Sequence, residues 1–250
     1  MLIIGNKPYR LLDMNPILDS YPSNTRCNMA LPNRNNGTIC DQWALCNHLY
    51  GNVIINKTEI NKFKKIYHKY KSEKIDDFFK DINKYKNLYK RIYHAKNSSG
   101  KLFNTFLKGK GSPYSFSKLP RTGYTSLFEN LLKGEYVSVF GFSVINEVRS
   151  TYYVKEGEEE NLAYHSKEEE LLILNWLHNN NIIDATLCFL IDEKIPTISC
   201  VDIKPTKKVI DKLINLYDKC YIIGYDIDVD RYSEYNIKHE SDKTLLYKKQ

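Results

Sequence analysis

A histidine followed by a cluster of carboxylates marks the part of the sequence that is best suited to acid–base chemistry. His165 is followed by Ser166 and then by the acidic run Glu168–Glu170. A histidine side chain accepts a proton near neutral pH, so it can serve as a general base. Ser166 and Glu169 have the spacing of a capping box, which predicts a helix over residues 168–179. The alternative is an ordinary surface histidine at a helix start.

Two predicted strand ends carry residues that suit a ligand. Gly5 and Asn6 follow the apolar residues 2–4, and Asn28 lies at the end of a second predicted strand, 24–29. A glycine lets a ligand approach the backbone closely, and an asparagine amide both donates and accepts hydrogen bonds. Open α/β sheets bind ligands at the carboxyl ends of their strands. The chain has no GxGxxG dinucleotide fingerprint, and the alternative for both segments is an ordinary turn.

A third segment, Thr122-Gly123, opens a predicted helix over residues 124–132. A threonine and a glycine at a helix start present a hydroxyl and backbone N–H groups, which together can hold an anion. The alternative is that Thr122 only caps the helix.

The composition limits the kinds of protein that the chain can be. Its 250 residues suffice for one large domain, and its formal net charge of +7 suits an anionic partner such as a nucleotide, a membrane surface or nucleic acid. None of the six cysteines forms a CxxC pair, so we expect buried reduced thiols and no structural zinc site. Neither an apolar run of transmembrane length nor a secretory signal is visible, and we expect a cytoplasmic protein.

Strands and helices are predicted to alternate along most of the chain. The alternation indicates an α/β fold with a Rossmann-like parallel sheet, in a single domain that spans residues 1–250. Strands are predicted over residues 2–4, 24–29, 136–141, 185–191 and 220–225. Helices are predicted over residues 15–18, 124–132, 168–179 and 207–217.

Three segments depart from this alternation. Residues 56–118 are rich in Lys and Tyr, and apolar side chains recur at helical spacing through Tyr89 and Ile92, which predicts an inserted helical segment. Residues 146–163 are polar and strongly charged, and we expect a mobile loop there. From Glu234 onward the chain is polar and is expected to fray.

In their order along the chain, these motifs resemble the sialyltransferases of the bacterial family 42 and the animal-type family 29 of glycosyltransferases. Gly5-Asn6 is similar to the turn after the opening strand of these enzymes. The resemblance covers residues 1–190 except for 56–118. The other matching residues are Arg26, Asn28 and Ala30 for the large sialyl motif, Pro120, Thr122, Gly123, Val139, Gly141 and Phe142 for the small one, His165 and Glu170 for the end motif, and Tyr164-His165-Ser166-Lys167 for the bacterial Gly-His-Ser-Lys.

The resemblance implies a GT-A-like nucleotide-binding domain that transfers a sialic acid, or a related 2-keto sugar acid, from its CMP derivative with inversion. It also implies a glycan or glycolipid acceptor and no metal cofactor. His165 would be the general base that deprotonates the acceptor hydroxyl. Tyr152 and Tyr153 lie in residues 143–163, the segment that matches a lid, and their hydroxyls would stabilise the departing phosphate. The residues matched to the CMP site are Gly5, Asn6, Asn28, Asn47, Thr122 and Gly123.

The chain also departs from the family pattern. Lys7 and Tyr9 stand where the bacterial enzymes have Gly and Ser, and Ile145 replaces the first lid tyrosine. An acidic run, Glu158–Glu160, lies in the lid segment. These differences concern the donor and the acceptor more than the fold.

A different chemistry would use the acidic sequence after the last predicted strand. Asp226 and Asp228 form a DxD sequence, and Asp230 adds a third carboxylate. Many glycosyltransferases hold a divalent metal and the donor diphosphate with such a sequence, so a metal-dependent transferase of another nucleotide sugar is one alternative. The other is a solvated acidic loop.

A third class of function is a binding module. Lysines alternate with aromatic residues over 62–71 and 84–91, a composition that can bind nucleic acid. At helical spacing the aromatic residues would be buried and the lysines solvated, so we expect no nucleic-acid partner. Peripheral association with an anionic membrane surface is the second interpretation of these lysines.

Overall fold

The structure is a computed structural model, which describes residues 1–5, 7, 9, 11–28, 32, 37–46, 86–95, 100–142, 165–200 and 203–249. The predicted lid, 143–163, lies outside the described residues. So do residues 56–85 and 96–99 of the predicted helical insertion. That the whole chain forms a single domain stays a prediction.

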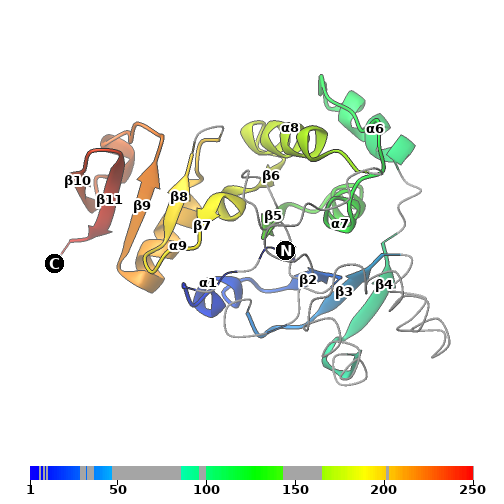
Figure 1. Ribbon diagram of the computed structural model, residues 1–250, viewed down its shortest axis with the longest axis horizontal. Coiled ribbons are helices and arrows are strands. Elements are labelled where there is room, and N and C mark those ends of the chain that lie inside the picture. The colour runs from blue at the N-terminus through cyan, green and yellow to red at the C-terminus, as the bar shows by residue number, and fades with distance from the viewer. Residues whose placement is uncertain are drawn as a thin grey trace, which may run out of the picture.

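A six-stranded parallel sheet forms the N-terminal part of the molecule and confirms the predicted Rossmann-like α/β fold (Figure 1). Its strand order is β4-β3-β2-β1-β5-β6, and every neighbouring pair is parallel. Strand β1 lies between β2 and β5 and is apolar and fully buried, as expected for an interior strand of a parallel sheet. The strands are β1 (Leu2–Ile4), β2 (Asn24–Cys27), β3 (Gln42–Leu45), β4 (Arg91–His94), β5 (Val137–Phe140) and β6 (Ile183–Asp184).

Helices α7 and α8 pack against this sheet, and helices α1 and α9 contact each other. Helix α7 contacts strands β1, β2, β3 and β5, and α8 contacts β6. Helices α1 and α9 were predicted at the residues where they occur. The helices with described bounds are α1 (Asn15–Leu18), α6 (Gly100–Gly109), α7 (Thr122–Leu131), α8 (Lys167–Asn179) and α9 (Lys207–Tyr217).

A second, five-stranded sheet follows in the C-terminal part of the chain. Its strand order is β10-β11-β9-β8-β7; only β8 and β9 are parallel, and the other pairs are antiparallel. Figure 1 shows this sheet at the opposite end of the molecule from β4. The strands are β7 (Leu190–Ile191), β8 (Thr197–Ser199), β9 (Lys219–Ile223), β10 (Tyr235–His239) and β11 (Lys243–Lys248).

Two predictions for the C-terminal part were wrong. The predicted fraying after Glu234 is contradicted by the hairpin of β10 and β11, which buries Thr244 and Leu246 on one face of the sheet. The predicted strand 185–191 is instead a 3₁₀ turn, η3 (Thr186–Phe189), followed by β7. Residues 185–190 are all buried and therefore have the largely apolar composition of a buried strand. Hydrophobic periodicity cannot distinguish a short buried strand from a buried turn.

The predicted helical pattern through Tyr89 and Ile92 was also wrong at its end. Residues Arg91–His94 form β4, which pairs with β3. The Tyr89 ring stacks on the buried Trp43 ring of β3, with centroids 4.7 Å apart. Tertiary packing of the aromatic residue therefore outweighs its helical spacing.

Candidate active site

The order in which strands are added to the parallel sheet reverses between β1 and β5. From β1 the chain builds β2, β3 and β4 on one side, and it then crosses to build β5 and β6 on the other. Open α/β sheets bind ligands outside the carboxyl ends of the strands at such a switch point. Gly5 follows β1 and Gly141 follows β5, so these two glycines flank the expected ligand position.

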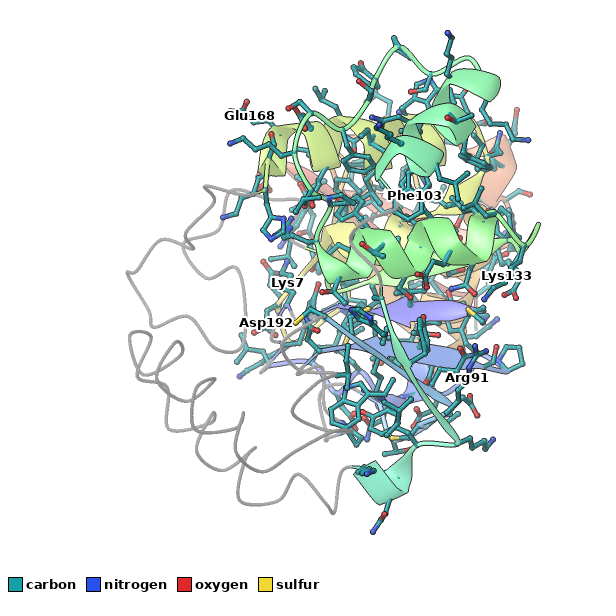
Figure 2. All side chains as sticks on the ribbon, turned by 90° about the vertical axis from the view of Figure 1, so that its right-hand side faces the viewer. Lys7, Arg91, Phe103, Lys133, Glu168 and Asp192 are labelled. Atoms are coloured by element: carbon teal, nitrogen blue, oxygen red, sulfur yellow. The ribbon has the colours of Figure 1, made fainter. Side chains whose placement is uncertain are left out.

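The same edge of the molecule collects the starts of two helices. Figure 2 shows Lys7 and Glu168 at this edge, whereas Arg91 at the start of β4 and Lys133 beyond the end of α7 lie at the opposite edge. The N-termini of α7 and α8 therefore lie at the edge where β1 and β5 end. Helix N-termini favour anions, because their first N–H groups have no partner within the helix.

Gly5 and Gly141 pack backbone against backbone. The Gly5 N–H donates to the Phe140 carbonyl at 2.7 Å, and the Lys7 N–H donates to the Gly141 carbonyl at 2.9 Å. A Cβ added at Gly5 would collide with the Gly141 carbonyl. Gly141 itself has a φ of +70°, which only glycine adopts without strain. Both glycines are therefore required by the close approach of the two strand ends.

Asn28 joins the end of β2 to the start of α7. It has a φ of 49°, and its Nδ2 donates to the Thr122 hydroxyl at 3.0 Å. Its Oδ1 accepts from the Cys46 N–H at 2.9 Å, so the amide orientation is set by a donor that can only face an oxygen. The Thr122 oxygen accepts from Asn28, which leaves the hydroxyl hydrogen to donate to a ligand.

Helix α7 begins at Thr122, but Thr122 is not its N-cap. The N-cap is Arg121, in an extended conformation, so the interpretation of Thr122 as a simple cap is wrong. Gly123 lies under the Phe142 ring, where an added Cβ would lie 2.9 Å from the Phe142 Cζ atom. The first turn, Thr122–Thr125, contains only uncharged residues. Its N–H groups and the Thr122 hydroxyl suit an anion such as a phosphate.

An ion pair connects the start of α7 with α8. Glu170 is 1% exposed; it accepts from the Arg121 N–H at 2.7 Å and forms an ion pair with the Arg121 guanidinium. Burial raises the pKa of Glu170, whereas the Arg121 charge, its hydrogen bonds and the nearby His165 lower it. Arg121 was not predicted as a site residue, although it directly precedes Thr122-Gly123.

His165 has a fixed side-chain orientation just before α8. Its Nδ1 lies 2.6 Å from the Leu119 carbonyl, which can only accept, so Nδ1 carries a hydrogen. In the neutral ring the lone pair is therefore on Nε2. Ser166 caps α8 as predicted, because its Oγ accepts from the Glu169 N–H at 3.3 Å. The Glu169 carboxylate binds Ser117 rather than the cap residue.

These contacts bring together five of the nine predicted site residues: Gly5, Asn28, Thr122, Gly123 and His165. Their links are the Gly5–Gly141 contact, the Phe142 ring over Gly123, the Asn28–Thr122 hydrogen bond, and the Arg121–Glu170 ion pair with the Leu119 carbonyl. The other four predicted residues, Asn6, Asn47, Tyr152 and Tyr153, lie outside the described part of the chain.

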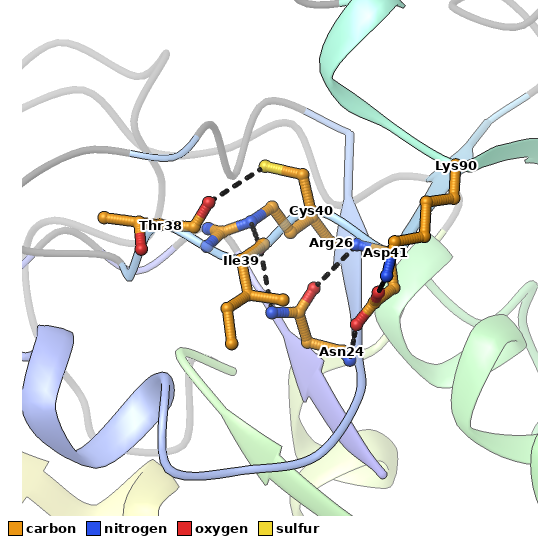
Figure 3. A network of polar contacts seen from close by, with 7 residues as sticks. All are labelled: Asn24, Arg26, Thr38, Ile39, Cys40, Asp41 and Lys90. Carbon is orange, nitrogen blue, oxygen red and sulfur yellow. Dashed lines mark hydrogen bonds and ion pairs between the residues drawn. The ribbon is translucent and has the colours of Figure 1, made fainter.

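Arg26, which matched the large sialyl motif, supports a loop. It is fully buried, and its Nε donates to the Ile39 carbonyl at 2.9 Å, where the Asn24 Nδ2 also donates at 2.9 Å (Figure 3). Asp41 accepts from the Asn24 N–H at 3.1 Å and pairs with the Lys90 ammonium at 2.6 Å. Arg26 thus holds the chain before β3 against β2.

Four of the six cysteines are buried, as expected, whereas Cys40 and Cys46 are half-buried. All six are described, and none forms a disulfide. Cys188 is fully buried, and burial raises the pKa of its thiol to about 12, against the opposing effects of a hydrogen bond to the Phe142 backbone and the Lys7 charge. Cys188 lies in η3, which packs against β5.

The alternative functional segments fall elsewhere. Asp226, Asp228 and Asp230 are exposed and follow β9 of the second sheet; the Asp228 carboxylate accepts from the Asp230 N–H at 3.2 Å. Among the described residues, no group of three or more His, Cys, Asp and Glu side chains could hold a metal ion. The lysine-rich residues 62–71 lie outside the described residues. No helix in the described part of the chain is long and apolar enough to cross a membrane.

Comparisons with known proteins give two similar solved structures. No protein-family model matches the chain, and neither does any curated protein sequence. One similar structure is the sialyltransferase CstII from Campylobacter jejuni in complex with a substrate analogue, CMP-3FNeuAc; it is 16% identical, with a TM-score of 0.38 over 73% of this chain and 79% of that chain. The other is the sialyltransferase CST-II in complex with a trisaccharide acceptor and CMP, 17% identical, with a TM-score of 0.34 over 73% and 78%. At these values the comparison assigns a role to no residue.

Proposed function

We propose that the protein is an inverting glycosyltransferase that moves a sialic acid, or a related 2-keto sugar acid, from its CMP derivative to a glycan or glycolipid acceptor. The observation that carries this proposal is the hydrogen bond between Asn28 and Thr122 at the carboxyl edge of the sheet. It joins two segments that were matched to one nucleotide site by sequence alone. The switch point between β1 and β5 supports the same position on topological grounds.

The donor would bind with its nucleotide across the strand ends. Gly5 offers backbone without a side chain, and Asn28 retains a second Nδ2 hydrogen and a second Oδ1 lone pair for a ligand. The phosphate would take the N–H groups of Thr122 and Gly123 and the Thr122 hydroxyl. Asn6 and Asn47 are further proposed contacts of the CMP moiety.

His165 would act as the general base. The acceptor hydroxyl oxygen attacks the anomeric carbon while the bond from that carbon to the phosphate oxygen breaks, and its electron pair leaves with CMP. The hydroxyl proton moves to Nε2, which holds the lone pair because Nδ1 donates to the Leu119 carbonyl. A single displacement inverts the anomeric configuration. Tyr152 and Tyr153 would donate to the departing phosphate, where negative charge increases.

The proposal assigns no metal cofactor, and it places the protein in the cytoplasm. Peripheral association with a membrane would bring the site to a glycolipid acceptor, and the net charge of +7 is compatible with an anionic surface. The competing proposal is a metal-dependent transferase that uses Asp226 and Asp228.

CMP release from CMP-sialic acid by the purified protein tests these proposals together. We expect release by the wild type with and without EDTA, and a loss of at least about a hundredfold in His165→Ala. His239→Ala is the matched control, because His239 is exposed on β10 of the second sheet. Activity that EDTA abolishes, and that Asp226→Ala also abolishes, would instead support the metal-dependent transferase.

A further inference from the structure

Two buried side chains connect the turn after β1, which includes the described residues Gly5, Lys7, Tyr9 and Leu11, to the second sheet. Lys7 and Tyr9 are 3% and 2% exposed. The Lys7 ammonium donates to the Leu190 carbonyl at 3.3 Å, and the Tyr9 hydroxyl donates to the same carbonyl at 2.8 Å. Just beyond, the Leu11 N–H donates to the Asp192 carboxylate at 2.9 Å. The turn therefore forms hydrogen bonds with one short segment, from Leu190 to Asp192.

This segment includes strand β7, which lies at the edge of the second sheet. Leu190 belongs to β7, which is the last strand in the order β10-β11-β9-β8-β7. An edge strand leaves backbone carbonyls without a partner strand. The side chains of Lys7 and Tyr9 satisfy the Leu190 carbonyl in place of a neighbouring strand.

The same turn is held from its other side by β5. The Lys7 N–H donates to the Gly141 carbonyl at 2.9 Å. The Tyr9 ring stacks on the Phe140 ring with centroids 4.9 Å apart, and the Lys7 ammonium lies 5.2 Å from the Tyr9 ring centroid. A buried ammonium is costly unless it is hydrogen-bonded, and here both the carbonyl and the aromatic ring stabilise it.

We propose that Lys7 and Tyr9 are positioning residues, which hold the turn after β1 between β5 and β7 and thereby set the affinity of the site for a nucleotide. The ligand in this inference, CMP, rests on the proposed function. The physical link is Gly5, which lies in the same turn and whose N–H donates to the Phe140 carbonyl of β5. A turn that moves by a fraction of an ångström loses the alignment of its contacts with a ligand. Through the Leu190 carbonyl, the second sheet becomes part of the nucleotide site.

Two conservative variants test this inference. Tyr9→Phe removes the hydroxyl and keeps the ring on Phe140, and Lys7→Met removes the ammonium and keeps an apolar stem. Tyr247→Phe on β11 and Lys194→Met in the β7–β8 turn are matched controls, because both side chains are exposed on the second sheet. Amide hydrogen exchange at positions 5 and 7, with the Ile3 amide of β1 as an internal reference for global opening, is measured together with CMP affinity by calorimetry.

We expect exchange at positions 5 and 7 to be about fivefold faster in each site variant, with the Ile3 amide unchanged. The CMP dissociation constant should rise about fivefold in the same variants and stay constant in the controls. Unchanged exchange at positions 5 and 7, or faster exchange with unaltered CMP affinity, would overturn the inference. Wild-type protein that does not bind CMP would instead count against the proposed function, and the exchange rates would then decide the positioning role alone.

Discussion

The Asn28 side-chain amide donates a hydrogen bond to the Thr122 hydroxyl at 3.0 Å, which joins two segments 94 residues apart in the sequence. One segment ends β2 and the other begins α7. Under the proposed function each residue also contacts the nucleotide, so loss of either partner should weaken nucleotide binding as well as the link itself.

Thr122→Val removes this link without a change in side-chain shape. We expect CMP affinity to fall about fivefold to tenfold, because the hydroxyl is also the proposed phosphate donor. Thr122→Ser, which retains the hydroxyl, should bind almost as well as the wild type. In a double-mutant cycle with Asn28→Gly, which tolerates the positive φ of residue 28, unfolding free energies should show a coupling of about 0.5–1.5 kcal/mol. A coupling of zero would show that the contact is not formed in solution.

The ion pair of Arg121 with Glu170 predicts a pH-dependent stability. Burial raises the pKa of Glu170, and the Arg121 charge opposes this rise. A carboxyl whose pKa is raised on folding contributes stability that is present below its unfolded pKa and is lost as pH rises through its folded pKa. Arg121→Met removes the opposing charge, so the Glu170 pKa should rise further.

We therefore expect Arg121→Met to lower the free energy of unfolding by about 3–5 kcal/mol at neutral pH and to recover part of this loss at mildly acidic pH, where Glu170 takes up a proton. Urea unfolding at the two pH values measures the difference. Arg91→Met, at an exposed residue of β4, is the control and should change little at either pH. An equal loss at both pH values would mean that packing of the arginine, rather than its charge, explains the result.

The fold was predictable where one local signal acted alone. The apolar β1, the Pro-initiated α1 and the amphipathic α9 were predicted within the residues they occupy, since their strand or helix pattern is not opposed by tertiary contacts. Strand β4 was not predicted, because the spacing of the aromatic residues around Tyr89 is that of a helix. The stacking of the Tyr89 ring on Trp43, which favours the strand, cannot be seen in the sequence. The β10–β11 hairpin was missed because few of its residues are buried: β10 has no buried residue, and β11 buries only Thr244 and Leu246.

The candidate site was predictable in part for a similar reason. The sequence motifs named residues that end strands or begin helices, and topology then brings such residues to one edge of a parallel sheet. The supporting contacts could not be predicted in this way. The Arg121–Glu170 ion pair, the Leu119 carbonyl at His165 and the Leu190 carbonyl at Lys7 all depend on how helices and sheets pack, which spacing does not report.

The glycines at the site differ in what restrains them, and alanine substitutions should separate the cases. At Gly5 the added Cβ meets the Gly141 backbone, which cannot move aside, and also the Phe142 Cδ1 atom at 2.9 Å, whereas at Gly123 its three nearest atoms all belong to the Phe142 ring. We expect Gly5→Ala to cost more than about 3 kcal/mol of unfolding free energy and Gly123→Ala about 1–3 kcal/mol. Phe142→Leu should relieve a larger share of the cost of Gly123→Ala than of Gly5→Ala, because the clash with the Gly141 backbone remains at Gly5.

Gly109, the last residue of α6, is the matched control for these substitutions, because an added Cβ there meets nothing within 4 Å. Gly109→Ala should raise stability by about 0.5–1 kcal/mol through the lower entropy of the unfolded chain. Thermal unfolding of the four single variants and of the two double variants with Phe142→Leu provides these values. A cost at Gly109 as large as that at Gly5 would refute close packing as the cause.

The second sheet should contribute substantially to the stability of the folded chain, although its last hairpin is rich in polar residues. Leu246 on β11 is fully buried, whereas its neighbour Tyr247 is 37% exposed. Leu246→Ala should therefore lower the unfolding free energy by about 2–5 kcal/mol, and Tyr247→Ala by clearly less. If Leu190 links this sheet to the turn after β1, Leu246→Ala should also speed amide exchange at position 7. If stability falls but exchange at position 7 does not change, the hairpin stabilises the fold without affecting the turn after β1.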